Sequence, residues 1–312
     1  MIVEQKRPHS AAGPAILERG TPKVSVIILT FNRPHLIGRA IQSVCEQDYQ
    51  DWEIVVVHDG PNEATTAVMN QWLEREPRIR YFRRNQTGNI ADAANFALCQ
   101  AEGEYIAILD DDDYWATPHK LTYQVAFLEE NPEYVGCGGG VVVVNQDSQE
   151  VLRYLKPESD EQIKRRALVA NPMVNSTTLY RRSTAEQFGG YDSTALTQFQ
   201  DWDFWLKMGT AGKLYNVPDY LTYYAIWENG SSFRHLKANG RAALKIVWRH
   251  RSSYSQFGVA LAFAFGYYAY AHLPERVRAA SFGFLSRLKK SLFAQKTAPT
   301  PQVRRDLDEQ EV

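Results

Sequence analysis

The chain has 312 residues, enough for one large domain or two small ones with a sizeable buried core. Apolar residues make up 44% and charged residues 23%, and the net charge of −1 gives no basic field that would favour a nucleic acid as partner. Cys45, Cys99 and Cys137 are isolated, which excludes a disulfide framework and a zinc pattern, so a cytoplasmic setting is expected.

Residues 1–21 are polar and lack the apolar core of a signal peptide, so they are expected to form a flexible leader. From residue 24 onward, short apolar runs rich in β-branched residues alternate with segments of helical periodicity. The expected strands cover 24–29, 53–58, 79–82 and 104–109, and the expected helices cover 34–44, 64–75 and 89–101. This alternation predicts an α/β fold with a mostly parallel, doubly wound sheet.

Polar side chains follow three of these strands where each strand ends. They are Thr30–Asn32 after the first strand, Asp59 after the second and the run Asp110–Asp113 after the fourth. Ligands of open α/β sheets bind at the carboxyl ends of the strands. We therefore expect these side chains to converge on one site.

The order of elements changes after residue 115. Helices are expected over 120–130 and 200–211, and strands over 141–144, 179–181 and 221–227. This second half predicts a mixed lobe that is added to the first half.

Four consecutive aspartates repel one another unless a positive group joins them. Mn²⁺ or Mg²⁺ is the simplest such group, because these ions bind one or two carboxylates and complete their shell with substrate phosphates. The alternative is a solvated acidic turn that caps the following helix. A P-loop, a Gly-x-Gly-x-x-Gly dinucleotide loop, paired metal-binding histidines and a Gly-x-Ser-x-Gly elbow are all missing from the sequence.

Four segments in this order and spacing closely resemble family 2 glycosyltransferases of the GT-A fold. They are residues 24–34, 40–44, 51–60 and 103–115, and the resemblance extends over about 22–230. It implies an inverting enzyme that moves a sugar from a nucleotide-diphosphate donor, such as a UDP-sugar, to a hydroxyl of a glycan or lipid-linked acceptor. It also implies a place in polysaccharide and cell-envelope biosynthesis.

The resemblance also implies roles for individual residues. Thr30, Phe31 and Arg33 lie where the family holds the donor nucleotide, with the aromatic ring near the base. Asp59 matches the carboxylate that bonds the base, Asp112 the metal ligand, and Asp110 and Asp111 the groups that contact the ribose or assist. Asp113 is expected to be a turn or cap residue.

In residues 200–206, Asp201 matches the family's general base, with Asp203 as the second choice. A base must reach the acceptor hydroxyl, and partial burial raises the basicity of a carboxylate. Asp201 is also placed to cap the helix that is expected to begin near Trp202. Two departures from the family pattern are Asp92, where many members have Arg, and Trp227, where many members have His.

The other basic residues near this half, Lys156, Arg165 and Arg166, are expected on a solvated helix face rather than at the phosphates. Toward the C-terminus, residues 257–273 are apolar and aromatic but at the lower limit of a membrane span. Residues 277–292 then have the pattern of a basic amphipathic helix. We expect peripheral membrane contact through 257–295, at the inner face of the cell membrane.

The sequence therefore predicts a GT-A glycosyltransferase with C-terminal helices. Its expected parts are the leader 1–21, the catalytic domain 22–235 (donor half 22–115, acceptor half 116–235), the helical region 236–295 and a disordered tail 296–312. The alternatives are a sugar-nucleotide-binding protein that transfers no sugar and a nucleotidyltransferase. A nucleotidyltransferase would need a glycine-rich basic loop after the first strand, which residues 29–33 lack.

Overall fold

A computed structural model describes residues 3–4, 20–86, 88–227, 235–274 and 276–278. The chain divides into two compact units, Met1–Ala271 and His272–Val312, and the sheet with the helices that pack on it belongs to the first unit. The expected tail 296–312 and residues 279–292 of the expected basic helix lie outside the described residues.

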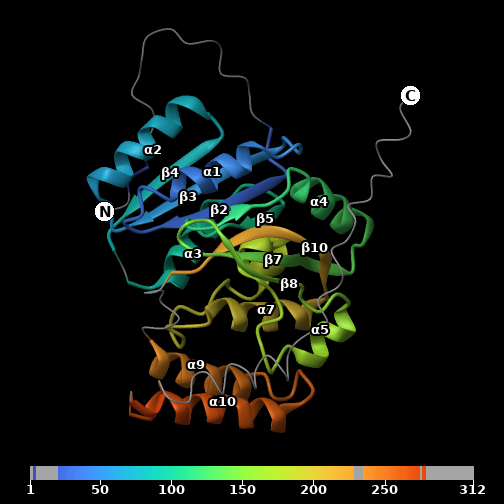
Figure 1. Cartoon of the computed structure of the whole chain (residues 1–312). Coiled ribbons are helices and arrows are strands. Elements are labelled where there is room, and N and C mark those ends of the chain that lie inside the picture. The colour runs from blue at the N-terminus through green and yellow to red at the C-terminus, as the bar shows by residue number, and fades with distance from the viewer. Residues whose placement is uncertain (1–2, 5–19, 87, 228–234, 275, 279–312) are drawn as a thin grey trace. The chain divides into compact units, whose positions relative to one another are not determined.

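A ten-stranded mixed sheet runs through the first unit, in the order β1-β4-β3-β2-β5-β9-β7-β10-β6 with β8 added to β7 (Figure 1). The strands are β1 (Val3–Glu4), β2 (Val24–Thr30), β3 (Trp52–Asp59), β4 (Ile79–Arg84), β5 (Tyr105–Ile108), β6 (Tyr114–Trp115), β7 (Tyr134–Val144), β8 (Glu150–Tyr154), β9 (Leu179–Arg181) and β10 (Lys213–Ala225). Strands β4, β3, β2 and β5 are parallel, as the alternation of the sequence predicted.

Helices cover both faces of the sheet. They are α1 (Ile37–Cys45), α2 (Glu63–Arg75), α3 (Ile90–Gln100), α4 (Lys120–Glu130), α5 (Asp160–Arg166), the 3-10 helix η1 (Asn175–Thr177), α6 (Arg182–Gln187), α7 (Gln200–Ala211), α9 (Leu236–Arg249) and α10 (Phe257–His272). Alternate residues of β2 separate the two cores. Val26 packs with α1, α2 and α4, whereas Ile27 packs with α3, α6 and α7.

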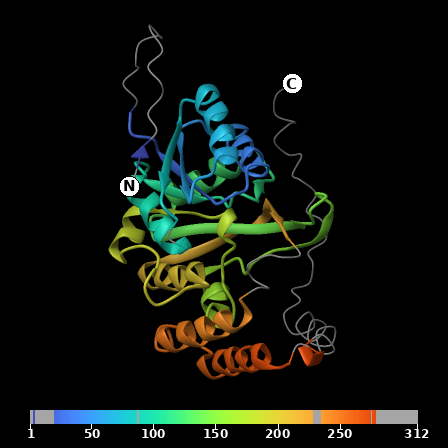
Figure 2. The same cartoon turned by 90° about the vertical axis from the view of Figure 1, so that its left-hand side faces the viewer.

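Helices α7, α9 and α10 share a third core, and the two views agree that they stack in this order below the sheet (Figures 1 and 2). Leu206 of α7 is buried with Ile246 of α9 and Ala260 of α10. The expected boundary at residue 235 therefore does not separate two compact units, because the apolar face of α7 is covered by the helices that follow that boundary.

Strands β7 and β10 are longer than expected, because glycines in β7 let the two strands pack closely. The glycine run 138–140 lies inside β7, which pairs in parallel with β10. A Cβ atom at Gly139 would come within 2.6 Å of Leu221 Cδ1. The expected leader also differs from the structure at one point, since Val3–Glu4 pairs with β4 as an edge strand.

Candidate functional site

The carboxyl ends of β2, β3 and β5 meet at one edge of the sheet, because these strands run parallel and in register. Hydrogen bonds join the end of β2 directly to the end of β5. Thr30 Oγ1 donates to Asp111 Oδ2 at 2.7 Å. Arg33 Nη1 donates to Asp111 Oδ1 at 2.9 Å and to Asp112 Oδ2 at 2.7 Å. The expected convergence of Thr30 and the aspartate run is confirmed, and Arg33 joins them.

In the aspartate run, Asp111 and Asp113 are buried, whereas Asp110 and Asp112 are half-buried. Burial, with the charges of Asp112 and Asp111, raises the pKa of Asp110 to about 7. Burial also raises the pKa of Asp111 to about 6, although the Arg33 guanidinium opposes the shift. The site thus holds more negative charge than the Arg33 contact neutralises, as expected of a pocket that receives a cation.

Asp113 closes a turn, as expected, since its backbone N–H donates to the carbonyl of Asp110 at 3.0 Å, and its side chain has a second role. It is 1% exposed, its Oδ2 accepts a hydrogen bond from Ser176 Oγ, and its Oδ1 accepts one from the backbone N–H of Ala225 at 2.9 Å. Ser176 Oγ also accepts a hydrogen bond from the backbone N–H of Asp110 at 3.2 Å. Asp113 therefore joins the aspartate run to η1 and to the end of β10.

The loop after β3 contacts the loop after β2. Gly60 adopts φ +87°, which favours glycine, and a Cβ atom there would lie 3.1 Å from the ring of Phe31. Phe31 itself is 49% exposed, which is unusual for a phenylalanine and leaves its ring available to a ligand. The carboxylate of Asp59 lies 3.3 Å from Arg84 Nε.

Arg84 is a cation of this region that sequence reasoning missed. Its Nη1 donates to the backbone carbonyl of Asp92 at 2.9 Å, while its Nε faces Asp59. The segment around Asp92 thus has an arginine beside it, supplied by the end of β4. Only the pairing of β3 with β4 brings Arg84 there, so no local pattern in the sequence pointed to it.

Asp201 lies in the first turn of α7 but does not cap it. The N-cap is Phe199, with a left-handed backbone and no side-chain hydrogen bond. Burial raises the pKa of Asp201, while the backbone N–H groups of Trp202 and Asp201 oppose the rise, followed by Asn171 and Lys156. Asn171 Nδ2 donates to Asp201 Oδ2 at 2.7 Å, and Lys156 Nζ donates to the backbone carbonyl of Asn171 at 2.9 Å.

Asp201 lies close enough to Asp110 for the two carboxylates to interact electrostatically, although they come from distant parts of the sequence. The charge of Asp201 is one of the causes that raise the pKa of Asp110. Both carboxylates also act on Tyr191, whose pKa is raised by burial first and then by neighbouring groups that include these two. Only the packing of α7 against the sheet brings them together.

Asp203 has a different environment from Asp201. Its side chain is fully buried and lies 2.9 Å from Arg249 Nη1 and from His250 Nε2, and 3.0 Å from Lys207 Nζ. Although burial alone would raise its pKa, these partners lower the pKa below the ordinary value. A carboxylate held by three cationic or imidazole groups of the protein is a structural ion pair rather than a free base.

Two further expectations concern the acceptor lobe. Lys156 was expected on a helix face, but it lies before α5. It donates to the backbone carbonyl of Asn171, the residue whose side chain donates to Asp201. Trp227 occupies the position where many members of the family have His. The centroid of its ring lies 6.4 Å from that of His35, which follows β2. An imidazole is thus present near this position, supplied from the other half of the chain.

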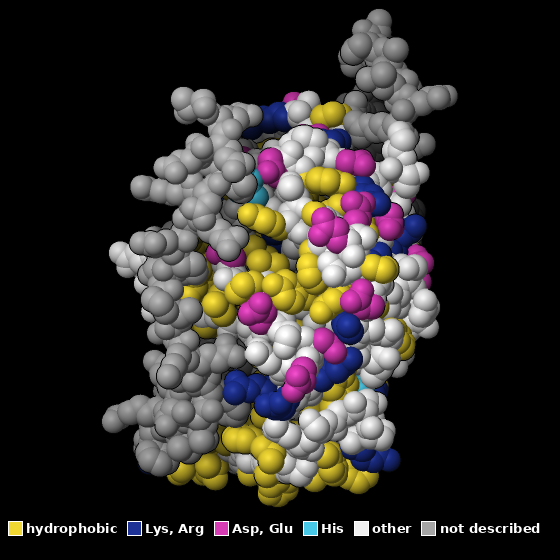
Figure 3. Space-filling view, turned by 90° about the vertical axis from the view of Figure 1, so that its right-hand side faces the viewer, with side chains coloured by type: hydrophobic (Ala, Val, Ile, Leu, Met, Phe, Trp, Pro, Cys, Tyr) yellow, Lys and Arg dark blue, Asp and Glu magenta, His cyan; other side chains and the backbone are white. Residues whose placement is uncertain are grey.

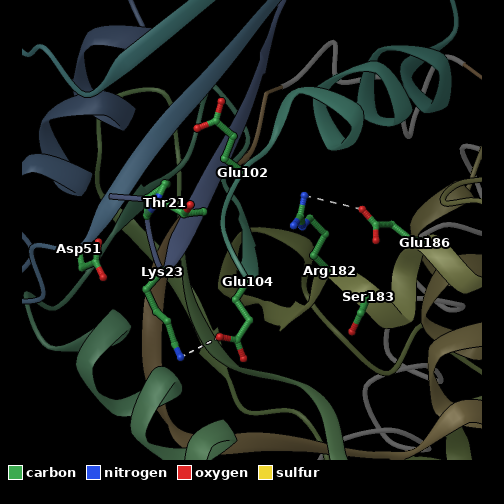
Figure 4. Close-up of a pocket in the computed structure, with 9 residues that line it drawn as sticks. Thr21, Lys23, Asp51, Glu102, Glu104, Arg182, Ser183 and Glu186 are labelled. Atoms are coloured by element: carbon green, nitrogen blue, oxygen red, sulfur yellow. Dashed lines mark ion pairs between the residues drawn. The ribbon is translucent and has the colours of Figure 1, made fainter. Parts of the chain in front are cut away.

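A cavity of about 320 Å³ opens at the opposite edge of the sheet (Figure 4). It is lined by residues that precede β2, β3 and β5, among them Lys23, Asp51 and Glu104, together with Arg182 and Glu186. The lysine pairs with Glu104 at 2.8 Å, and the arginine pairs with Glu186 at 3.8 Å. This cavity is distinct from the aspartate site, and its lysine and arginine are paired with its own carboxylates.

A sequence model of glycosyl transferase family 2 matches residues 25–189, more than half of the chain. EpsE of Bacillus subtilis, named as a glycosyltransferase, is 29% identical over 216 residues, 68% of this chain and 76% of EpsE. WcaA of Escherichia coli, named for colanic acid biosynthesis, is 30% identical over 199 residues, 61% of this chain and 67% of WcaA.

Two solved structures are similar in fold. The mannosyltransferase PcManGT of Pyrobaculum calidifontis, in complex with GDP-Man and Mn²⁺, gives a TM-score of 0.58 at 21% identity, covering 86% of this chain and 81% of PcManGT. TarS of S. aureus in complex with UDP gives 0.58 at 19% identity, covering 88% and 76%. The fold is thus that of the GT-A glycosyltransferases. The chain belongs to glycosyl transferase family 2 and is a glycosyltransferase.

Proposed function

We propose that the chain transfers a sugar from a UDP-sugar, with inversion, to a hydroxyl of a glycan or lipid-linked acceptor. One observation carries this proposal. The half-buried carboxylate of Asp201 has a raised pKa and lies near enough to Asp110 to raise the pKa of Asp110, although the two come from different halves of the fold. Transfer with inversion needs such an arrangement, with donor groups on one side of the sugar and a base on the other.

The donor nucleotide is assigned to the ends of β2 and β3. The exposed ring of Phe31 is suited to stack on the base, and Asp59 to accept a hydrogen bond from it. Thr30 and Arg33 hold Asp111 in place for the ribose. TarS, a structural neighbour, has been solved with UDP and with UDP-GlcNAc, which supports a uridine donor.

A divalent cation, Mn²⁺ or Mg²⁺, fits the donor set at Asp112, with Asp110 nearby. The excess negative charge that raises the pKa of Asp110 is relieved by a cation. In the described part of the chain, no group of three or more His, Cys, Asp or Glu side chains is arranged to hold a metal. Mn²⁺ and Mg²⁺ bind one or two carboxylates and complete their shell with water and donor phosphates.

When bound, such an ion supplies positive charge for the leaving nucleoside diphosphate. The residues of the chain perform the remaining steps. Arg33 lies 2.7 Å from Asp112 Oδ2 and would turn from this carboxylate toward the diphosphate as the donor arrives. Asp201 accepts the proton of the acceptor hydroxyl while the oxygen attacks the anomeric carbon. Asn171 orients the carboxylate, and burial keeps it basic.

We assign the donor and the acceptor to different halves of the domain. Residues 22–115 hold the donor, residues 116–235 hold the acceptor, and the helices after 235 support the acceptor half. The relatives EpsE and WcaA, the second named for colanic acid biosynthesis, support an acceptor in cell-envelope polysaccharide synthesis. We further assign the enzyme to the inner face of the membrane, in peripheral contact through residues 257–295.

The test compares Asp201→Asn with Asp203→Asn in a transfer assay with UDP-sugars and Mn²⁺. Asp201→Asn is expected to lower kcat by about 10²–10⁴-fold, with donor binding unchanged. Asp203→Asn is the matched control in the same turn of α7, and it affects folding stability instead. Unchanged transfer by Asp201→Asn would overturn the proposed base. Donor binding without any transfer, across the panel of donors, would favour the sugar-nucleotide-binding alternative.

A further inference from the structure

The outward face of α10 carries no charged side chain. Residues 257–271 contain no Asp, Glu, Lys, Arg or His, yet only Ala260, Ala264 and Ala271 are buried. Phe265 is 61% exposed and Val259 is 49% exposed. A helix that is apolar on all sides is normally enclosed by protein or lipid. Figure 3 shows hydrophobic side chains gathered at the lower end of the molecule, where Figure 1 places α10.

The neighbouring helix α9 carries a basic stripe. Lys237, Arg241 and Lys245 are four residues apart and at least partly exposed, so they lie on one face of the helix. Trp248 continues this face, is 57% exposed and has the Arg251 guanidinium 4.8 Å from its ring centroid. The sequence from residue 235 to residue 274 contains no Asp or Glu. The positive charge of the stripe is therefore not balanced within these two helices.

The apolar face of α10 and the basic stripe of α9 together indicate the chemistry of the partner that binds there. An exposed apolar helix beside unbalanced cations, with an exposed tryptophan between them, matches the boundary between anionic headgroups and acyl chains. A second copy of the chain fits less well. A two-fold contact through the same surface would set the basic stripe against its own copy, and like charges repel.

We propose that the α9–α10 surface binds an anionic lipid bilayer, and we define this surface by Lys237, Arg241, Lys245, Trp248, Val259 and Phe265. Helix α10 has 16 residues, about 24 Å at 1.5 Å per residue, which is shorter than the hydrocarbon core of a bilayer. Among the described residues, no helix is long and apolar enough to cross a membrane. The helices therefore lie on the bilayer. This inference rests on the proposed function and deepens it, because it names the surface that meets the lipid of a lipid-linked acceptor.

The experiment is sedimentation of the full chain with vesicles of phosphatidylcholine alone or mixed with phosphatidylglycerol. The wild type is expected to bind the anionic vesicles at least tenfold more tightly, and salt is expected to weaken that binding. The double variant Lys237→Gln/Arg241→Gln should lose about tenfold or more of this binding. Val259→Glu/Phe265→Glu should lose binding through the apolar contact instead.

A matched control removes two cations elsewhere. Lys164→Gln/Arg165→Gln on α5 makes the same change in net charge and should leave vesicle binding unchanged. Equal losses in both charge variants, no binding by the wild type, or an oligomer in light scattering that only Val259→Glu/Phe265→Glu dissolves would each overturn the proposal. Transfer to a soluble acceptor without vesicles is measured in parallel. It should persist in all these variants, so failure of the lipid surface and failure of the proposed function are separable.

Discussion

The four aspartates after β5 are chemically different although they are identical in sequence. Asp111 is held by Thr30 and Arg33, whereas Asp113 is held by a hydroxyl and a backbone N–H. Asp112 shares the arginine, and the pKa of Asp110 is raised by burial and by the neighbouring carboxylates. Position in the run therefore decides which carboxylate is available to a ligand.

At the donor side, we predict that Phe31→Ala raises KM for the donor with little change in kcat. The ring is half exposed and assigned to the base, and stacking on an aromatic ring is worth about 1–3 kcal/mol, or about 5- to 150-fold in binding. Phe31→Tyr keeps the ring and should bind the donor normally. Equal donor KM for the wild type and Phe31→Ala would show that the base lies elsewhere.

For Asp203 we predict a loss of stability. Replacing a fully buried carboxylate that faces Arg249 and Lys207 leaves the charges of these two residues unmatched, which costs about 3 kcal/mol for a buried pair. Urea unfolding of Asp203→Asn should therefore show a lower free energy of unfolding. Asp201→Asn is the control and should unfold close to wild type. The same loss in both variants would contradict the separate roles assigned to these two aspartates.

At the scale of elements, η1 holds the aspartate run through one side chain. Ser176 Oγ contacts both Asp110 and Asp113, and its carbonyl accepts from Trp115 Nε1 and Thr222 Oγ1, each at 3.0 Å. We predict that Ser176→Ala raises the Mn²⁺ concentration needed for half-maximal donor binding. The loss of kcat at saturating Mn²⁺ should be smaller.

Ser176→Thr keeps the hydroxyl and should restore the metal dependence. Calorimetric titration of donor binding at several Mn²⁺ concentrations measures the effect without turnover. An unchanged Mn²⁺ requirement in Ser176→Ala, with the fold intact by circular dichroism, would rule out a positioning role for η1.

Helix α4 carries a buried lysine, which predicts a pH dependence of stability. Burial lowers the pKa of Lys120 from 10.5 to about 7. Its Nζ donates to Gln124 Oε1 at 2.7 Å and lies 4.2 Å from the centroid of the Trp115 ring. Between these two pKa values the unfolded chain binds more protons than the folded one. This lysine therefore makes the free energy of unfolding rise with pH, by up to about 1.4 kcal/mol per pH unit.

Lys120→Met removes this titration, so the variant should gain less stability than the wild type from about pH 7 to about pH 9. Urea unfolding at both pH values measures the difference. Parallel pH profiles of the two proteins would mean that Lys120 titrates normally in the folded state.

The parallel strands and their helices could be predicted from the sequence because their signals are local. Alternation and apolar runs indicate strands, and a period of 3.6 residues indicates helices, so α4 (Lys120–Glu130) and α7 (Gln200–Ala211) were predicted at their observed bounds. Strand β8 was not predicted, because all five of its residues are exposed and it lacks an apolar face. The glycines at the start of β7 hid most of that strand, since glycine is unfavourable in a strand unless a neighbour needs the space.

The site was predicted where residues lie close to strand ends and missed where contacts are long-range. Thr30, Arg33 and the aspartate run follow strands, so their convergence follows from a parallel sheet. Asn171 and Ser176 lie in a segment without periodicity, and they contact Asp201 of α7 and the aspartate run, which are far away in the sequence. Sequence spacing contains no information on such contacts.

At the scale of the whole molecule, ligand binding should raise thermal stability, because donor and metal bind only the folded site. At about 100 times the dissociation constant, a ligand adds about 2.7 kcal/mol, or about 5–10 °C in Tm for a unit of this size. We predict that UDP with Mn²⁺ raises Tm more than the sum of either alone, since the diphosphate completes the shell of the metal. Asp112→Asn should remove the contribution of Mn²⁺ and keep that of UDP.

The size of the Mn²⁺ effect should depend on pH. Because the pKa of Asp110 is about 7 and that of Asp111 about 6 without metal, protons compete with Mn²⁺ for this site as the pH falls. The rise in Tm on adding Mn²⁺ and UDP should therefore be larger at about pH 8 than at about pH 6. Magnesium in place of manganese should show the same trend. A contribution of Mn²⁺ to Tm that is equal at both pH values, or that persists in Asp112→Asn, would place the metal away from the aspartate run.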